Sequence, residues 1–505
     1  MRHHLGARKE GGLPRSSPVG FEDREIAADE LAATEDCDLV VVGAGIAGLM
    51  AALKGAEEGA SVICVEKMTR GRGCFECFGA VNAKCQEGTE INKVHLIDEM
   101  HRAAYWRVRP EPIRTYVDRS GEATDFWQAM LDKGANGFVI TKVEQAPSSN
   151  GMPAVTPLID TELGFYDSPC LPPDAGVRSG YSGIYVCLEM QEVAKQYDNL
   201  ELRFSTPAVQ LIREGDRVAG VIVKNPDGSY GRINAGKGVI LACGDYSSNQ
   251  DMLDYYAPDT KGFSLFTTFR DGSALCAGMW AGALMTPTTH TKMIHGEPAA
   301  VRLEMPFLFL DVHGDRFMDE SCCRMGYMNN FARPYLAEAG FQDSTAAKFF
   351  SIVPSTWEDY FEEWKAEAPF DISQYNGDNK VNPEKWIKAD TVEELADAMI
   401  AYAQENDWTA MQLDKQRIVE SVARYNELCA AGRDEDFGKA AKYLVPIEGG
   451  PYYAVPRGSN KLPAILGGLV VNADHQCLNE QFQPIDGLFA VGNASGQFFG
   501  GVDYP

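Results

Sequence analysis

A glycine-rich stretch near the start of the chain has the residue types and spacing that bind a dinucleotide. Gly43, Gly45 and Gly48 follow four apolar residues, and Glu66 ends the next apolar run. Such glycines allow a tight turn, close approach of the backbone to a pyrophosphate, and close packing of a helix on a strand. The N-terminus of that helix attracts the phosphates, and the acidic residue binds ribose hydroxyls. Because an acidic residue disfavours a 2′-phosphate, the sequence predicts a nucleotide of the FAD or NAD kind.

One strand, one helix and a second strand must hold these residues in place. The apolar runs at 39–42 and 61–65 predict buried parallel strands, and the segment between them has helical spacing. A glycine-rich loop over residues 68–83 follows, and its flexible backbone suits the wall of a cofactor site. Short alternating runs over residues 200–235 predict a β-meander, which leads into another buried strand within 238–245. A meander that returns the chain to a parallel sheet is typical of flavoproteins more than of simple NAD dehydrogenases.

The composition of the chain then changes. Residues 285–445 hold most of the tryptophans and several acidic clusters, which predicts a separate α+β domain, and a capping box at Thr391 begins one of its helices. After residue 445 the composition again resembles that of the first part of the chain, with predicted strands at 466–472 and 485–491. Residues 1–36 are polar and rich in Gly and Pro, without the apolar core of a signal peptide, and predict a disordered tail.

Charge and cysteine content restrict the partners and the compartment. The formal net charge of −26 argues against nucleic acid or an anionic membrane as a partner, since both need a basic surface. No apolar run approaches the ~20 residues of a membrane span. Thirteen scattered cysteines suit a reducing compartment, so we expect a cytoplasmic protein. Cys74 and Cys77 form a single CxxC, and without a second pair they predict no metal site.

Eight stretches in order resemble the FAD-dependent fumarate reductase and succinate dehydrogenase flavoprotein superfamily, most closely its soluble bacterial branch with urocanate reductases and 3-ketosteroid dehydrogenases. They are DLVVVGAGIAGLMAA (with Glu66), GKGVILACGDYSSN, HGDRFMDE, TVEELA, RYNELCAAGRDEDFGK, PYYA, ILGGLVVN and GLFAVGNASG. The resemblance implies an α/β fold. A Rossmann-like FAD-binding domain (37–284 and 446–505) is interrupted by an inserted α+β capping domain (285–445).

The resemblance also implies the cofactor and the chemistry. Hydride would pass between flavin N5 and one carbon of an activated C–C bond, while a protein acid or base handles the proton on the neighbouring carbon. The substrate would lie between the flavin and the capping domain. The residues implied to hold FAD are Gly43, Gly45, Ala47, Gly48, Glu66, Lys67, Gly73, Cys74, Gly79, Val209, Ala242, Gly244, Asp271, Gly272, Gly492 and Asn493.

The chain departs from the fumarate reductase pattern at the substrate side. Those enzymes carry a histidine before a Met-Gly-Gly turn, whereas residues 463–468 read Pro-Ala-Ile-Leu-Gly-Gly. They also carry an arginine after the last glycine-rich turn, which is missing from 499–505, and the capping-domain acid arginine is not evident at 354–358. We therefore expect a less cationic, more aromatic pocket and a substrate other than fumarate. The family's last helix is also missing, which predicts an incomplete sequence or a damaged site.

Six residues are candidates for catalysis. His290 and His295 stand at the entrance to the capping domain, where they could orient or protonate a substrate, or be structural. Glu320 and Arg324, with the nearby Arg316, lie in a segment that the resemblance links to proton relay. The alternative for them is a plain surface ion pair on one helix face. The remaining candidates for the acid are Arg333, as a substitute arginine, and Tyr504, by resemblance to the steroid branch.

The sequence therefore predicts an FAD-dependent oxidoreductase acting on CH–CH bonds. Reduction of the C=C bond of an α,β-unsaturated acid or enone is the first hypothesis. A dehydrogenase running in the reverse direction, as in the 3-ketosteroid branch, and an inactive flavin-binding remnant remain open. Because the sequence has no second dinucleotide fingerprint and no haem motif, we expect a separate electron donor. A plain NAD dehydrogenase is a further alternative, which a colourless protein that binds NADH would favour.

Overall fold

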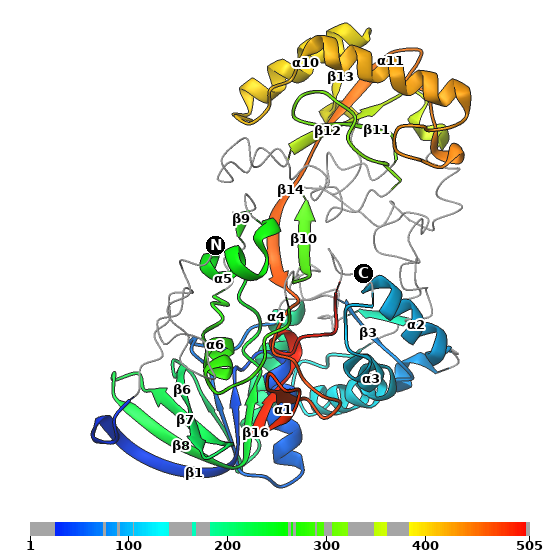
Figure 1. The fold of residues 1–505 in the computed structure, drawn as a ribbon. Helices are drawn as coiled ribbons and strands as arrows, with labels where there is room; N and C mark the ends of the chain where they lie inside the picture. Colours follow the sequence, from blue (N-terminus) through cyan, green and yellow to red (C-terminus); the bar gives the residue numbers. More distant parts are fainter. Residues whose placement is uncertain are drawn as a thin grey trace.

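The computed structural model has two parts connected by a pair of strands (Figure 1). It describes residues 26–73, 77–87, 91–104, 106–140, 164–167, 182–260, 264–265, 269–287, 290–296, 306–321, 348–360 and 383–500. We call the described residues of 26–287 and 466–500 the basal part, and those of 306–458 the capping part. Across the described ranges, no helix is both long and apolar enough to cross a membrane.

The basal part is built on a sheet with the strand order β15-β16-β8-β1-β2-β5. Pairing is parallel from β16 through β8, β1 and β2 to β5. The strands are β1 (Leu31–Val42), β2 (Val62–Val65), β5 (Leu200–Arg203), β8 (Tyr230–Leu241), β15 (Gln476–Leu478) and β16 (Pro484–Ala490). All four residues of β2 are buried, as the continuous apolar run predicts for a strand covered on both faces.

Helices cover the two faces of this sheet. Val41, Val62 and Cys64 pack against α1 (Ile46–Glu57), α3 (Pro110–Leu131) and α4 (Ser182–Ala194). Val40, Val42, Ile63 and Val65 point to the other face, because side chains alternate along a strand. There they join a core that includes residues of α5 (Gln250–Tyr256) and α6 (Ser273–Trp280).

Strand β1 begins earlier than the sequence predicts. Its residues Leu31–Cys37 pair with the first half of β8. On its other side β8 pairs with the meander strand β7 (Arg217–Lys224), which pairs in turn with β6 (Ala208–Glu214). The prediction of a disordered tail is therefore wrong for residues 31–36. Most of these residues are exposed, so their order comes from backbone pairing with β8 and not from burial.

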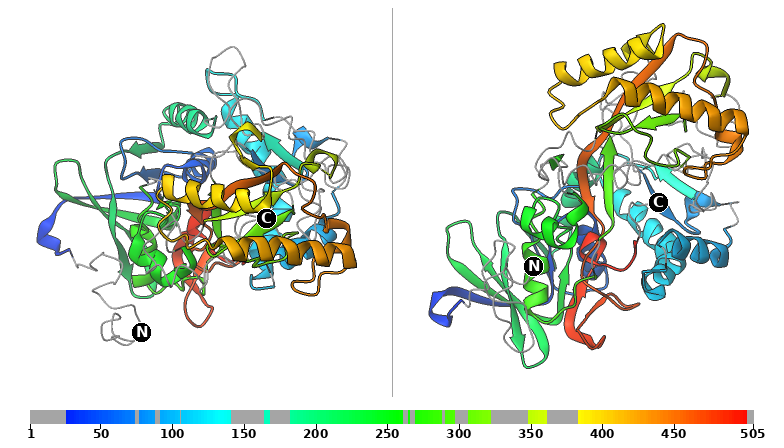
Figure 2. Two further views of the ribbon diagram at one scale, coloured as in Figure 1. Left: turned by 90° about the horizontal axis from the view of Figure 1, so that it is seen from above. Right: turned by 45° about the horizontal axis from the view of Figure 1, so that its top comes forward.

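A smaller sheet lies in the capping part, where two helices cover it, and extends along the connecting strands toward the basal part (Figures 1 and 2). The strand order is β10-β14-β12-β11, and β13 and β9 also pair with β14. The elements are β9 (Ser264–Leu265), β10 (Lys292–Gly296), β11 (Leu308–Leu310), β12 (Lys348–Val353), β13 (Ile387–Ala389), β14 (Tyr452–Ile465), α10 (Val392–Glu405) and α11 (Lys415–Ala431). The side chain of Thr391 caps α10, as predicted, and Asp414 caps α11.

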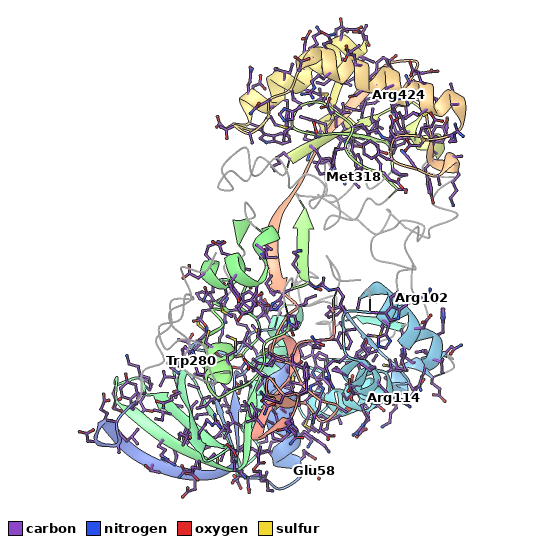
Figure 3. All side chains as sticks on the ribbon, in the orientation of Figure 1. Glu58, Arg102, Arg114, Trp280, Met318 and Arg424 are labelled. Atoms are coloured by element: carbon purple, nitrogen blue, oxygen red, sulfur yellow. The ribbon has the colours of Figure 1, made fainter. Side chains whose placement is uncertain are left out.

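The long strand β14 connects the two parts. Its residues 453–458 pair with β12, and residues 459–465 pair with β10 (Figure 2). Residues 452–458 thus belong to the capping sheet, although the sequence assigns everything after 445 to the returning FAD domain. Figure 3 places Met318 on the side of the capping part that faces the basal part, and Met318 shares a buried cluster with Leu462 and Ile465 of β14.

The remaining elements are short or lie at the periphery. The strand predicted at 466–472 consists only of isolated bridges, at Leu469 and Val471. The other elements are η1 (Ala28–Glu30), β3 (Cys77–Ala80), η2 (Lys84–Gln86), α2 (Lys93–Ala103), β4 (Gly164–Asp167), η4 (Pro258–Thr260), η9 (Pro383–Lys385), η10 (Ala441–Tyr443) and η11 (Gly492–Ala494).

Candidate functional site

The glycine turn after β1 is packed so closely that side chains are excluded. Gly43 has a φ of +109°, and a Cβ added there would lie 2.5 Å from the carbonyl oxygen of Ala242, at the end of β8. A Cβ added at Gly48 would lie 1.8 Å from the carbonyl oxygen of Gly43. Gly43, Gly48 and Ala242, all predicted from the sequence, therefore meet where the parallel strands β1 and β8 end.

The N-terminus of α1 is available to an anion. Gly45 is its N-cap residue and has no side chain to bond the first N–H groups of the helix. Gly71 of the following loop packs on Ala44, since an added Cβ would lie 1.8 Å from the Ala44 carbonyl oxygen, and Gly73 is buried. A turn without side chains, next to an uncapped helix start, fits the pyrophosphate of a dinucleotide.

The Glu66 carboxylate binds the glycine turn and the loop that follows β2. One carboxylate oxygen accepts a hydrogen bond from the backbone N–H of Ala44 at 2.9 Å, and the other accepts one from Met68 at 2.9 Å. A carboxylate has about four lone-pair sites, so two oxygens with one bond each retain capacity for ribose hydroxyls. The position and the chemistry both fit the predicted ribose contact.

The return segment after β16 completes the site. Gly492 has a φ of +62°, and a Cβ added there would lie 2.9 Å from the Cβ of Ala47 on α1. Asn493 directs its amide to the Asp245 carboxylate at 3.4 Å. Two predicted residues from opposite ends of the chain, Ala47 and Gly492, thus lie in contact.

Lys67 and Asp271, both predicted cofactor residues, form an ion pair of 2.8 Å. Burial alone would raise the pKa of Asp271, but the hydrogen bond and charge of Lys67, with bonds from Ser273, outweigh burial and lower it. Gly272 follows with a φ of +74° as the N-cap of α6. The pair therefore ties the residue after Glu66 to the start of α6.

The sequence reasoning missed Asp245 and Arg270, which lie beside predicted residues. Asp245 is fully buried, and its carboxylate contacts the Arg270 guanidinium at 3.1 Å. The available signal was an acidic residue in a turn of small residues after a buried strand, where a carboxylate needs a buried partner.

The other residues predicted to bind FAD either have no described contact with this group or lie outside the described residues. Gly79 lies in β3 opposite Phe165. Val209 lies in β6 and packs toward Ile212 and Ile222. Cys74 lies outside the described residues. The structure thus brings together the glycine turn, Glu66, Lys67, the Asp271–Gly272 turn and the return turn, but places no described contact between them and Gly79 or Val209.

His290 is held as a neutral, packed side chain. Its Nε2–H donates to the carbonyl oxygen of Thr286 at 2.7 Å, so Nδ1 accepts from the Tyr246 hydroxyl at 2.6 Å. The ring stacks on Tyr256 and lies against Gly467. Burial lowers the pKa of His290 to about 4. Both ring nitrogens are engaged, so this geometry favours the structural alternative over proton transfer.

Glu320 belongs to a buried network of four charges in the capping part. Arg316 donates two hydrogen bonds to Glu320, at 2.8 and 2.9 Å, and two to Asp434, at 3.0 and 2.8 Å. Lys439 lies 3.2 Å from Glu320 and also donates to the Tyr425 hydroxyl at 2.6 Å. The network thereby joins residues 316–320, near the start of the capping part, to residues 434–439, near its end.

The predicted surface ion pair on a helix is therefore wrong for Glu320. Residues 315–321 are not helical, and Arg316 and Glu320 are buried. Burial would raise the pKa of Asp434, but the hydrogen bonds from Arg316 and from backbone N–H groups outweigh burial and lower it. Burial lowers the pKa of Lys439.

The other catalytic candidates cannot be placed by their side chains. His295 lies in β10, paired with Lys461, and only its backbone is described. Arg324, Arg333 and Tyr504 lie outside the described residues.

Comparisons with known proteins identify the family to which the chain belongs. A family described as FAD binding domain matches residues 38–503. The vinyl phenol reductase of Lactiplantibacillus plantarum is 28% identical, with 92% of this chain and 90% of that protein covered. The NADH:fumarate oxidoreductase of Klebsiella pneumoniae is 25% identical and covers 93% of this chain, but only 46% of that protein is matched.

A solved structure has the same fold. The 3-ketosteroid-delta4-(5alpha)-dehydrogenase from Rhodococcus jostii RHA1 is 22% identical, with a TM-score of 0.61, and 93% of this chain and 92% of that chain are covered. The predicted α/β fold with an FAD-binding domain is confirmed.

Proposed function

The chain belongs to the FAD binding domain family and is an FAD-dependent oxidoreductase, and we propose that it reduces the C=C bond of an alkene conjugated to an aromatic ring or a carbonyl group. When bound, FAD supplies the hydride for one carbon of that bond. The glycine turn and the start of α1 bind the pyrophosphate, and Glu66 binds the ribose.

The observation that carries the proposal concerns the end of β14. Ala464 and Ile465, which precede the Gly467–Gly468 turn, are buried, and Ile465 belongs to the apolar core of the basal part. In the fumarate reductase pattern, a histidine that binds a substrate carboxylate precedes this turn. Buried apolar side chains offer no hydrogen bond to a carboxylate, so a substrate with two carboxylates is disfavoured.

A relative matched over 92% of this chain and 90% of its own length supports the same substrate class. It is a vinyl phenol reductase. A vinyl phenol carries an alkene conjugated to an aromatic ring and has no carboxylate. A substrate of this kind needs no carboxylate-binding residue, and the described residues Ala464 and Ile465 before the turn are apolar.

The proton for the second carbon must come from a residue other than His290. At neutral pH the His290 ring carries no charge, its Nε2–H is bonded to Thr286, and its Nδ1 is occupied by Tyr246. His295, Arg324, Arg333 and Tyr504 remain candidates for the donor. We also propose that electrons reach the flavin from a separate donor.

The test is an anaerobic visible spectrum of the purified protein after its flavin has been reduced by reduced methyl viologen. Alkenes would be added in turn: 4-vinylphenol, a cyclic enone, acrylate and fumarate. We expect a yellow protein whose reduced flavin is reoxidised at least tenfold faster by 4-vinylphenol or the enone than by fumarate. Fastest reoxidation by fumarate would refute the substrate class. Reoxidation by none of these alkenes would refute the reductase proposal and favour the reverse direction or a protein without turnover.

A further inference from the structure

A single buried carboxylate joins four segments of the basal part. Oδ1 of Asp245 accepts the backbone N–H of Ser247 at 2.7 Å. Oδ2 lies 3.1 Å from the Arg270 guanidinium and accepts the backbone N–H of Ile465 at 3.3 Å. The Asn493 amide approaches the same oxygen at 3.4 Å. The turn after β8, the approach to α6, the end of β14 and the return turn therefore meet at this carboxylate.

These four segments border the proposed flavin site. Asp245 follows Gly244, and a Cβ added at Gly244 would lie 3.1 Å from Cδ of Arg270, so the arginine side chain lies along this turn. Asn493 follows Gly492, which contacts the first turn of α1. Ile465 is the last residue of the strand that comes from the capping part.

The charges of the pair compensate each other. Asp245 is fully buried, and the Arg270 side chain is one-fifth exposed. Removing one partner of such a pair leaves an uncompensated charge in a site of low polarity. The Lys67–Asp271 pair lies next along the chain and is also neutral overall. Within each pair, one positive and one negative charge therefore compensate each other.

We propose that Asp245 and Arg270 form a positioning pair, which holds the return turn and the end of β14 against the flavin and keeps the local charge neutral, so that it sets the flavin reduction potential. This proposal rests on FAD binding at the glycine turn, and not on the identity of the substrate. Reduced flavin carries more negative charge than oxidised flavin. Removing a negative charge beside it therefore favours reduction, and removing a positive charge opposes it.

The experiment compares Asp245→Asn, Arg270→Gln and the double variant as FAD-bound proteins. Each is brought to equilibrium with a reference dye, without substrate, and the ratio of reduced to oxidised flavin is read from the visible spectrum. We expect Asp245→Asn to raise this ratio at least tenfold and Arg270→Gln to lower it at least tenfold. Tenfold corresponds to about 30 mV for a two-electron couple. The double variant should return to within about threefold of the parent, because it restores neutrality.

Two further variants keep the test decisive. Arg270→Lys retains the charge and should keep the ratio near that of the parent, even if Asp245→Asn fails to retain FAD. Arg424→Gln breaks an exposed ion pair on α11, at the top of the capping part in Figure 3, and should leave the ratio unchanged. Shifts of equal sign in the two single variants would refute the proposal, as would equal ratios for Arg270→Lys and Arg270→Gln. Because no substrate is present, neither result depends on the proposed alkene reduction.

Discussion

The buried charge network of the capping part should be its most sensitive point. Replacing Asp434 with Asn keeps the shape and one oxygen acceptor but removes a charge. Arg316 then has two bonds to Glu320 and a neutral amide in place of its second carboxylate. The backbone N–H groups of Phe437 and Lys439, which donate to Asp434, also lose a charged acceptor.

The expected cost follows from burial. Removing one partner of a buried ion pair typically costs about 3 to 5 kcal/mol, because the remaining charge is left uncompensated. For a domain of about 150 to 250 residues, such as the capping part, each kcal/mol lost from the free energy of unfolding lowers the melting temperature by roughly 2 to 4 °C. We therefore expect a decrease of about 6 to 20 °C. Scanning calorimetry of the FAD-bound protein measures this, with the flavin absorbance recorded to verify that the basal part retains FAD.

The matched control lies two residues away. Asp436 accepts two hydrogen bonds from Arg424, at 3.1 and 2.8 Å, but this pair lies at the surface. Exposed pairs contribute about 1 kcal/mol or less, so Asp436→Asn should lower the melting temperature by only a few degrees. A decrease for Asp434→Asn no larger than that for Asp436→Asn would refute the reasoning that burial makes the network costly to break.

Three further predictions concern the glycine turn, acid stability and His290. Gly48→Ala should abolish FAD binding, measured as the loss of flavin absorbance after purification, because its Cβ would lie 1.8 Å from the Gly43 carbonyl oxygen. Gly236→Ala, with its nearest neighbour at 3.6 Å, should retain FAD. The pKa of Asp434 is lower in the folded protein than in the unfolded chain, so its stabilisation is complete above the unfolded value of about 3.9 and is lost as pH falls below it. Calorimetry at pH 6 and pH 3 should therefore show a smaller acid-induced loss in Asp434→Asn than in the parent, and equal losses would contradict this. The His290 ring should not titrate between pH 5 and pH 8, since burial lowers its pKa to about 4, and a histidine NMR titration with an assigned midpoint near 6.5 would overturn its placement.

Local sequence signals determined the nucleotide-binding core of this protein. The apolar run before Gly43, the glycine spacing and the acidic residue at 66 act within one strand–helix–strand unit, so their meaning does not depend on distant residues. The start of α10 was likewise predictable, because the Thr391 side chain bonds the backbone N–H of Glu394 three residues away. The prediction of a dinucleotide of the FAD or NAD kind, and of the glycine turn that binds it, therefore required no tertiary information beyond this unit.

Only the tertiary structure decided which charged residues are buried together. Arg316 and Asp434 are 118 residues apart in sequence, and Asp245 and Asn493 are 248 apart. No periodicity joins residues at such separations, so no sequence pattern favoured a buried network over a surface pair for Glu320. The early start of β1 and the crossing within β14 depended in the same way on strands supplied from elsewhere in the chain. The length of a strand depends on the backbone N–H and C=O groups that neighbouring strands offer to it. A charged side chain can be buried only where partners compensate its charge. Both conditions are properties of the folded chain.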